Sequence, residues 1–175
     1  MKTCATQWPS LHRRGQSGFT LIESVTVIAL TGVLTATALP RLTALTGDAR
    51  YAALQSAGSA LATVAATSHG KFMIDGRSTQ TLEDVSVSMV GGYPAADRAT
   101  FDAAGLGKGY VIYTSASASA STAPAVPAGS MVIVPKSIAG TARARDCYLV
   151  YTESRAPNIP PVITEGDNTS GASCT

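Results

Sequence analysis

Aromatic and charged residues are scarce in this sequence, at 6% and 14% of its 175 residues. Few aromatics argue against a large core that encloses a ligand. The abundant Gly, Ala, Ser and Thr residues suit thin sheets and closely packed helices instead. The formal net charge is only +2, and the basic residues are scattered rather than clustered. We therefore predict no nucleic-acid partner, and the composition favours a structural protein.

Catalytic and metal-binding patterns are missing as well. The sequence contains no phosphate-binding glycine loop, no zinc-type spacing of cysteines and no serine triad. Glu165 and Asp167 are weak candidates for a metal site, because calcium prefers such oxygen ligands, but their surroundings do not follow the EF-hand pattern. We expect no catalytic residue, no cofactor and no enzymatic activity.

One long apolar run is present, from Phe19 to Leu39, and its only charged residue is Glu23. As a helix these residues would extend about 32 Å, enough to cross a hydrocarbon layer of about 30 Å. Four threonines interrupt the run, so the core of a secretory signal and a buried helix are alternatives, although the length argues against a signal. Lys2, Arg13 and Arg14 precede the run and predict a cytoplasmic N-terminus.

The carboxylate of Glu23 needs an explanation in such a helix. An ionised side chain in a membrane-spanning helix costs at least about 2.5 kcal/mol unless it is paired. Glu23 lies near the start of the run, where it could reach the lipid headgroups and where the helix dipole favours a negative charge. The residues alone leave two possibilities open, namely contact with the headgroups and a specific cationic partner.

The stretch from Arg13 to Glu23 reads RRGQSGFTLIE and resembles the processing site of type IV prepilins. In that family a membrane peptidase cuts after the glycine and methylates the new amino group. The resemblance therefore implies a leader of residues 1–18, a cut between Gly18 and Phe19, and N-methylation of Phe19. It also implies that Glu23 accepts the amine of Phe19 from a neighbouring subunit. The leader is longer than the five or six residues usual before a phenylalanine start, so either it is genuine or the start codon is misassigned.

The same resemblance implies partners and a location. The partners would be other pilin subunits in a homopolymer, prepilin peptidase, and a pilus assembly platform with its motor. Before assembly the chain would be a single-pass protein of the inner membrane, and after assembly part of an extracellular pilus, or fimbrium. The resemblance is to type IVa pilins, and the tetrapeptide GYPA at 92–95 is similar to mannose-sensitive haemagglutinin-type pilins, which favours surface attachment.

A helical pattern continues beyond the apolar run, from Arg41 to about Ser68. Apolar or small residues recur every three or four positions there, at Leu45, Ala49, Ala53, Ala57, Leu61 and Val64. Gly70 is a plausible end. The sequence thus predicts one long helix over 19–70, with 19–39 as its transmembrane part.

Gly32 and Pro40 are expected to disturb this helix. Proline removes a backbone donor and kinks or breaks a helix, and glycine weakens one. Related filaments lose helicity between a glycine and a proline at this place. The resemblance therefore suggests an extended stretch from Gly32 to Pro40 after assembly, with a plain kink as the alternative.

The rest of the chain predicts a connecting region at 71–109 and a sheet region at 110–175. Strands are expected at Tyr110–Thr114, Ser130–Val134, Cys147–Thr152 and Val162–Thr164. Four antiparallel strands on one long helix give an α+β fold, which is the type IV pilin fold that the resemblance implies.

Inside the connecting region, 81–89 fits either a short helix or a strand, 91–95 is a turn, and 97–106 is a short helix. The segment 115–129 reads SASASASTAPAVPAG, which predicts an exposed loop, with an O-glycosylated patch as the alternative.

Removal of the leader takes away Cys4 and leaves Cys147 and Cys174 on the extracytoplasmic side. A disulfide is expected there, as in the C-terminal loop of type IVa pilins. It would close a loop that runs from 147 through 174, which the chain-entropy model values at roughly 3 to 4 kcal/mol.

The predicted function is that of a structural pilus subunit that is processed by prepilin peptidase and polymerised through its N-terminal helix. One alternative is a pseudopilin of a type II secretion system, which shares the N-terminal segment and binds calcium in a C-terminal loop. Another is a minor tip pilin that binds DNA or a surface. A single-pass anchored domain that does not assemble would leave the GFTLIE motif unexplained.

Overall fold

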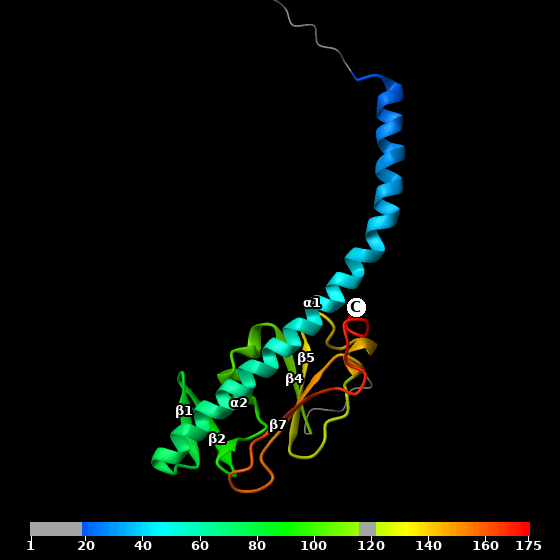
Figure 1. Ribbon diagram of the computed structural model, residues 1–175. Coiled ribbons are helices and arrows are strands. Elements are labelled where there is room, and N and C mark those ends of the chain that lie inside the picture. Colours follow the sequence, from blue (N-terminus) through cyan, green and yellow to red (C-terminus); the bar gives the residue numbers. More distant parts are fainter. Residues whose placement is uncertain (1–18, 116–121) are drawn as a thin grey trace, which may run out of the picture. The chain divides into compact units, whose positions relative to one another are not determined.

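The computed structural model describes residues 19–115 and 122–175 (Figure 1). The predicted leader, with Gly18 and Cys4, lies outside the described residues, as does part of the predicted loop 115–129. The chain divides into two units, an N-terminal one that ends at Leu39 and a head that begins at Pro40.

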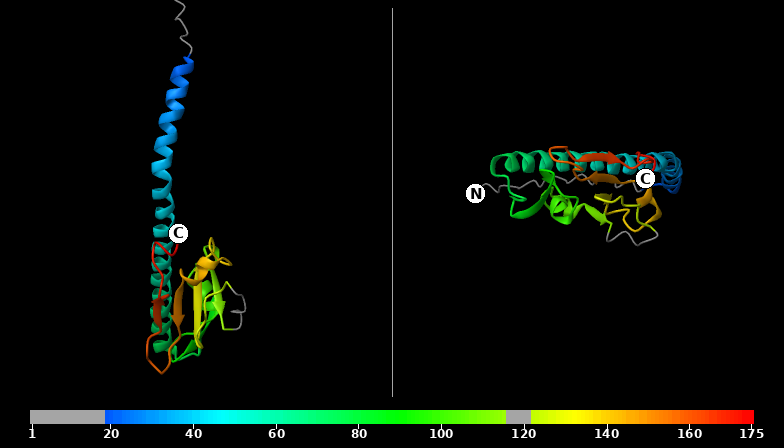
Figure 2. Two further views of the ribbon diagram at one scale, coloured as in Figure 1. Left: turned by 90° about the vertical axis from the view of Figure 1, so that its right-hand side faces the viewer. Right: turned by 90° about the horizontal axis from the view of Figure 1, so that it is seen from below.

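One long helix comes first, and short strands, a short helix and two 3-10 turns follow. The elements are α1 (Leu21–Asp75), β1 (Thr79–Leu82), β2 (Val85–Val90), β3 (Tyr93–Pro94), α2 (Arg98–Ala103), η1 (Leu106–Lys108), β4 (Tyr110–Thr114), β5 (Ser130–Pro135), η2 (Ala142–Arg145), β6 (Leu149–Thr152) and β7 (Val162–Glu165). In the head, α1 packs on antiparallel sheets (Figure 2). The predicted α+β class is confirmed, and the architecture is consistent with the type IV pilin fold.

Helix α1 passes through Gly32 and Pro40 without a break. The helix is therefore not interrupted at these residues in this structure, and the expected kink stays a prediction. A proline inside a helix removes one backbone hydrogen bond. The helix can still continue when good helix-forming residues flank the proline on both sides. The extended stretch expected after assembly stays a prediction.

The end of α1 also differs from expectation, because the helix continues past Gly70 to Asp75. Gly76 follows with a left-handed φ of 64°, which glycine adopts at little cost, and its N–H donates to the carbonyl of Phe72 at 2.8 Å. Contacts with the chain beyond the helix hold the last turns. The Nζ of Lys71, for example, donates to the carbonyl of Thr81 at 2.7 Å.

The face of α1 that packs on the head is a narrow stripe. Its buried residues are Gly47, Leu54, Ala57, Leu61, Val64, Ala65 and Ser68. The predicted face is wrong at its start, because Leu45, Ala49 and Ala53 are exposed. Successive steps of four residues move around a helix by about 40° each. The predicted row therefore drifted away from the sheet, whereas the observed stripe mixes steps of three and four.

The main sheet has the order β4-β5-β6-β7, and all its neighbours are antiparallel. This confirms the predicted four-stranded sheet. Strand β5 is buried at all six residues, whereas the edge strand β7 is mostly exposed. The core lies where β5 meets α1, and its fully buried side chains include Leu54, Leu61, Met131 and Ile133.

A second sheet, β1-β2-β3, occupies the part of the connecting region that fitted either a helix or a strand. Two tight turns build it. Gly91 and Gly92, with φ of 61° and 88°, join β2 to β3 at the predicted turn. Glu83 and Asp84 join β1 to β2 with φ of 44° and 68°, although side chains disfavour this conformation.

Tyr151 links the two sheets. Its ring is fully buried, and its hydroxyl donates to the carbonyl of Pro94 at 2.8 Å. Burial raises the pKa of Tyr151, so the phenol stays neutral and remains a donor. This bond satisfies a buried carbonyl and attaches β3 to β6.

We predict that Tyr151→Phe lowers the free energy of unfolding of the head by about 1 to 3 kcal/mol, because a buried carbonyl loses its donor. Urea unfolding of the full chain in detergent, followed by tyrosine fluorescence, measures the change. Tyr93→Phe is the matched control, because the Tyr93 hydroxyl has no hydrogen bond to any described residue. Equal stability of the two variants would contradict the role of Tyr151.

Candidate assembly segment and C-terminal turn

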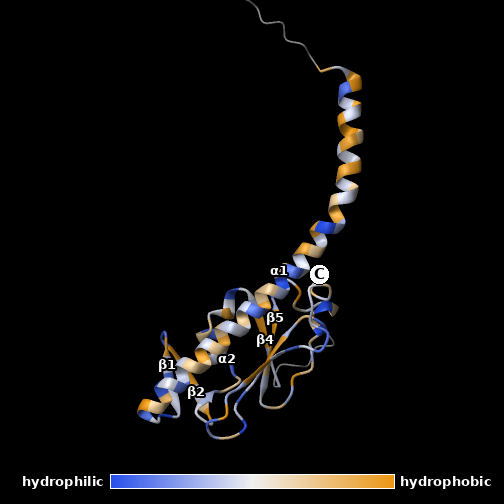
Figure 3. Cartoon of the chain, in the orientation of Figure 1, coloured by the Kyte–Doolittle hydropathy of each residue, from blue (hydrophilic) through white to orange (hydrophobic). Residues whose placement is uncertain are grey.

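The apolar segment 19–39 has no cover of its own. Every residue in it is exposed, including Phe19 at 79% and Leu21 at 83%. Figure 3 shows mainly hydrophobic residues along this part of α1. The helix is long and apolar enough to cross a membrane. No part of its 18-residue apolar stretch is buried. Water is a poor solvent for this surface, which fits a membrane or other subunits as its cover.

The threonines that interrupt the apolar run satisfy their hydroxyl protons within the helix. Thr26 donates to the carbonyl of Glu23 at 2.9 Å, and Thr35 donates to that of Thr31 at 2.7 Å. Thr31 and Thr37 bond in the same way to carbonyls three or four residues earlier. The hydroxyls therefore need no water, which makes this threonine-rich helix compatible with a lipid environment.

The junction residues lie at the start of α1. Phe19 and Thr20 precede the helix, and the Thr20 hydroxyl accepts from the Glu23 backbone N–H at 3.3 Å as an N-cap. The carboxylate of Glu23 is exposed and makes no hydrogen bond or ion pair within residues 19–115 and 122–175. Gly18, on the other side of the predicted cut, lies outside these ranges. The site thus presents an unpartnered carboxylate beside the predicted new N-terminus.

The second feature is the C-terminal turn, which we define as residues 170–175. A disulfide joins Cys147 to Cys174, as expected, and both residues are fully buried. The hydroxyl of Ser173 donates to the carbonyl of Asp146 at 2.8 Å. Hydrogen bonds therefore support the disulfide in closing the C-terminal turn onto the segment before β6.

The C-terminal turn also docks on α1, by way of two glycines. A Cβ at Gly47 would collide with the backbone oxygen of Gly171 and with Thr175. A Cβ at Gly171 would collide in turn with the carboxylate of Asp48. Arg50 completes the contact, because its Nη1 donates to the carbonyl of Cys174 at 2.6 Å and its Nε to the hydroxyl of Ser137 at 3.1 Å. The sequence analysis did not predict this docking. The available signal was Gly47, because a glycine inside a helix often marks a close approach of another segment.

The weak metal candidates are not brought together in a metal site. The Glu165 carboxylate accepts from the Tyr51 hydroxyl at 2.9 Å and from the amide of Gln55 at 3.4 Å, which attaches β7 to α1. The hydrogen bond to Glu165 raises the pKa of Tyr51. Among the described residues, neither Glu165 nor Asp167 belongs to a group of three or more His, Cys, Asp or Glu side chains that could hold an ion.

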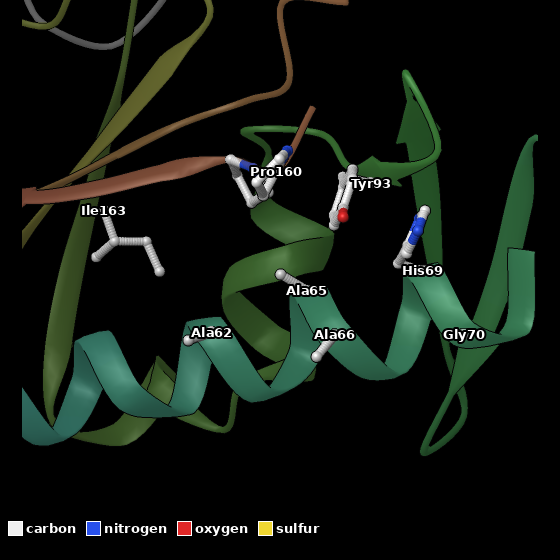
Figure 4. Close-up of a pocket in the computed structure, with 9 residues that line it drawn as sticks. Ala62, Ala65, Ala66, His69, Gly70, Tyr93, Pro160 and Ile163 are labelled. Atoms are coloured by element: carbon white, nitrogen blue, oxygen red, sulfur yellow. The ribbon is translucent and has the colours of Figure 1, made fainter. Parts of the chain in front are cut away.

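A small pocket of about 380 Å³ lies between α1 and the segment before β7 (Figure 4). His69 stacks on Tyr93 at one end of it, with ring centroids 4.1 Å apart and planes 4° apart. The Nδ1 of His69 lies 2.9 Å from the carbonyl of Gly92, which can only accept, so Nδ1 carries the proton. The pair fastens the end of α1 to β3, and sequence reasoning did not foresee it.

Comparison with known proteins agrees with the N-terminal geometry. Residues 13–39 match the family described as the prokaryotic N-terminal methylation motif. There is no significant match among curated proteins or solved structures. The motif covers the predicted junction and the whole apolar run.

The motif, together with the fold, supports a type IV pilin-like, or prepilin-like, protein. The same motif supports a precursor of the pilin or pseudopilin kind. The motif implies processing by prepilin peptidase and assembly into pilus-like polymers, and the apolar helix fits membrane anchoring before assembly. The family to which the motif points is structural rather than enzymatic.

We predict that Gly47→Ala destabilises the head by about 1 to 3 kcal/mol, because the new methyl group meets backbone that cannot move freely. The matched control is Gly70→Ala, also inside α1, where nothing lies within 4 Å of the new Cβ. In this control the free energy of unfolding should rise by about 0.5 to 1 kcal/mol, because alanine has a higher helix propensity than glycine. Urea unfolding of both full-length variants measures the difference, and changes of the same sign would contradict the close approach.

Proposed function

We propose that the chain is a structural subunit of a type IV pilus. It is made as a precursor, cut between Gly18 and Phe19, methylated on the amine of Phe19 and polymerised through α1. The single observation that carries the proposal is the uncovered apolar segment with one unpartnered carboxylate, Glu23, directly after the junction.

The chemistry of the junction explains why cutting and assembly belong together. Before the cut, the nitrogen of Phe19 is part of a peptide bond and carries no charge. The cut creates a cationic amine at the start of an apolar helix, and a charge there is costly unless it is paired. Glu23 of a neighbouring subunit supplies the opposite charge. The pair neutralises both groups and links each subunit to the next.

The head supports a location outside the cytoplasm. The disulfide between Cys147 and Cys174 is typical of oxidising compartments, and it holds the C-terminal turn on α1. The N-terminus would be cytoplasmic and the head periplasmic before assembly, and the head would then lie on the surface of an extracellular pilus. In this proposal the partners are other copies of the chain, prepilin peptidase and the assembly platform with its motor, and the pilus serves surface attachment.

A pseudopilin of a type II secretion system is the second candidate. It is favoured by the same observation, because the methylation motif at 13–39 and the uncovered helix are common to both kinds of subunit. The two candidates differ in where the polymer ends, since a pilus leaves the cell and a pseudopilus stays in the periplasm.

Mass spectrometry of the filament fraction sheared from cells tests the proposal. We expect an abundant chain that begins at N-methylated Phe19, lacks residues 1–18, and is lighter than its reduced form by the two hydrogen atoms lost when the disulfide forms. A chain that is processed at the same bond but absent from the sheared fraction would indicate the pseudopilin.

The Glu23→Val variant tests the role of the carboxylate. It should be cut and anchored normally but yield less sheared filament, by about tenfold or more, because an unpaired amine would remain in the apolar assembly. The matched control is Thr26→Val, which removes a hydroxyl satisfied within the helix and should assemble normally. Normal filament yield from Glu23→Val would rule out the proposed pairing.

A further inference from the structure

Basic residues that are scattered in the sequence come together at one end of the main sheet. Strand β4 begins where β5 ends, because Tyr110 pairs with Pro135. Strand β6 begins near the same end, because Leu149 pairs with Ile133. The segments next to these three strand ends are therefore neighbours. They carry four exposed basic side chains, which we call the basic end: Lys108, Lys136, Arg143 and Arg145.

The four side chains of the basic end have no partner in the head. None of them makes a hydrogen bond or an ion pair with any residue in 19–115 and 122–175. Acidic side chains at this end of the sheet lie mainly on its β7 side, where Glu165 and Asp167 are about 10 Å from β5, two strand spacings away. Asp146 is the acidic neighbour of η2 itself. The positive charge on the β4 and β5 side is thus left open to solvent.

The basic end is attached to α1 a short way beyond the apolar segment. The Nε of Arg50 donates to the hydroxyl of Ser137 at 3.1 Å, and Ser137 lies between β5 and η2. Helix α1 is continuous from Leu21 to Asp75. Between Leu39 and Arg50 it rises by about 16.5 Å, and this length depends on the helix alone.

That length is within electrostatic reach of a membrane around the apolar segment. The headgroup layer extends about 6 Å beyond the hydrocarbon on each side, and a charge acts over a further ~8 to 10 Å at physiological salt. Arg41 comes two positions after Leu39 and is exposed and unpartnered among the described residues. Asp48 lies instead against Gly171 of the C-terminal turn. The first turns of α1 in the head therefore add positive charge near the membrane surface.

We propose that the basic end binds the anionic headgroups of the membrane that holds the apolar segment, before assembly. Each Lys or Arg near an anionic lipid surface contributes attraction that falls off within a Debye length. A lipid surface suits charges from separate segments, because it does not require an exact geometry. The contact keeps the head at the membrane surface and is lost when the subunit leaves the lipid. The inference rests on the membrane-anchored stage of the proposed function and gives the head a lipid-binding surface.

Hydrogen exchange of the full chain in lipid nanodiscs tests this contact. One set of discs contains only zwitterionic phosphatidylcholine, and in the other anionic phosphatidylglycerol makes up about one third of the lipid. The measurement is the exchange rate of the backbone amides in 136–146. We expect exchange to be slower by about threefold or more with the anionic lipid at low salt. The difference should vanish at about 0.5 M salt, because the Debye length is then only ~4 Å.

Charge reversal identifies the groups that bind. The double variant Arg143→Glu and Arg145→Glu should abolish the difference between the two lipids. The matched control is Arg77→Glu with Arg155→Glu, which changes the net charge equally. Both control residues are exposed and lie elsewhere, because Arg77 follows the end of α1 and Arg155 follows the end of β6 that pairs with the start of β5. The control should keep the difference.

The disulfide reports whether each variant remains folded. Cys147 and Cys174 are buried and bonded, so they resist alkylation while the head is intact. If the η2 variant loses this resistance, Lys108→Glu with Lys136→Glu replaces it, because these side chains are exposed and belong to other segments of the basic end.

Equal exchange of the wild-type chain in the two kinds of disc would overturn the inference. So would a control variant that loses the lipid effect as completely as the folded charge-reversal variant does. These outcomes do not depend on the sheared filament that tests the proposed function. A chain that responds to anionic lipid but is absent from the sheared fraction would contradict the pilus and leave the lipid contact standing.

Discussion

Water is a poor solvent for the apolar segment from Phe19 to Leu39, which is exposed along its whole length. Nothing else in the described chain covers it. The segment fits a lipid bilayer before assembly, and the methylation motif implies that other subunits cover it afterwards. The hydroxyls of Thr26, Thr31, Thr35 and Thr37 donate to the helix itself, whereas the carboxylate of Glu23, the only charged side chain of the segment, has no partner among the described residues. In the proposed assembly, this single carboxylate selects the neighbour and sets the register.

The head solves a different problem, because it must fold in an aqueous compartment around only part of a long helix. Its stripe on α1 is narrow, and small residues let backbone come close where large side chains would not fit. Gly47 admits the C-terminal turn, the disulfide closes it, and Arg50 binds its carbonyl. The buried stripe and the C-terminal turn thus occupy one side of α1.

Much of the candidate site could be predicted from local sequence. The motif around Gly18 and Phe19, the apolar run and the two late cysteines are contiguous or isolated signals, which is why they could be identified without a fold. Strands β4 to β7 were also found, because short apolar runs bounded by turn residues mark them. Gly91 and Gly92 marked one turn, whereas Glu83 and Asp84 adopt a similar turn without its usual residues. The segment 81–89, which contains this second turn, therefore fitted either a helix or a strand.

Local sequence already indicated the class of this protein, since the junction motif and the span-length apolar run with one early carboxylate are contiguous in the chain. The end of α1, its buried face and the docking of the C-terminal turn at Gly47 became visible only in the folded chain. Each of these depends on residues far apart in the chain, such as His69 with Tyr93 or Gly47 with Gly171. Local propensity does not encode such contacts, because their energy appears only when the distant surfaces meet.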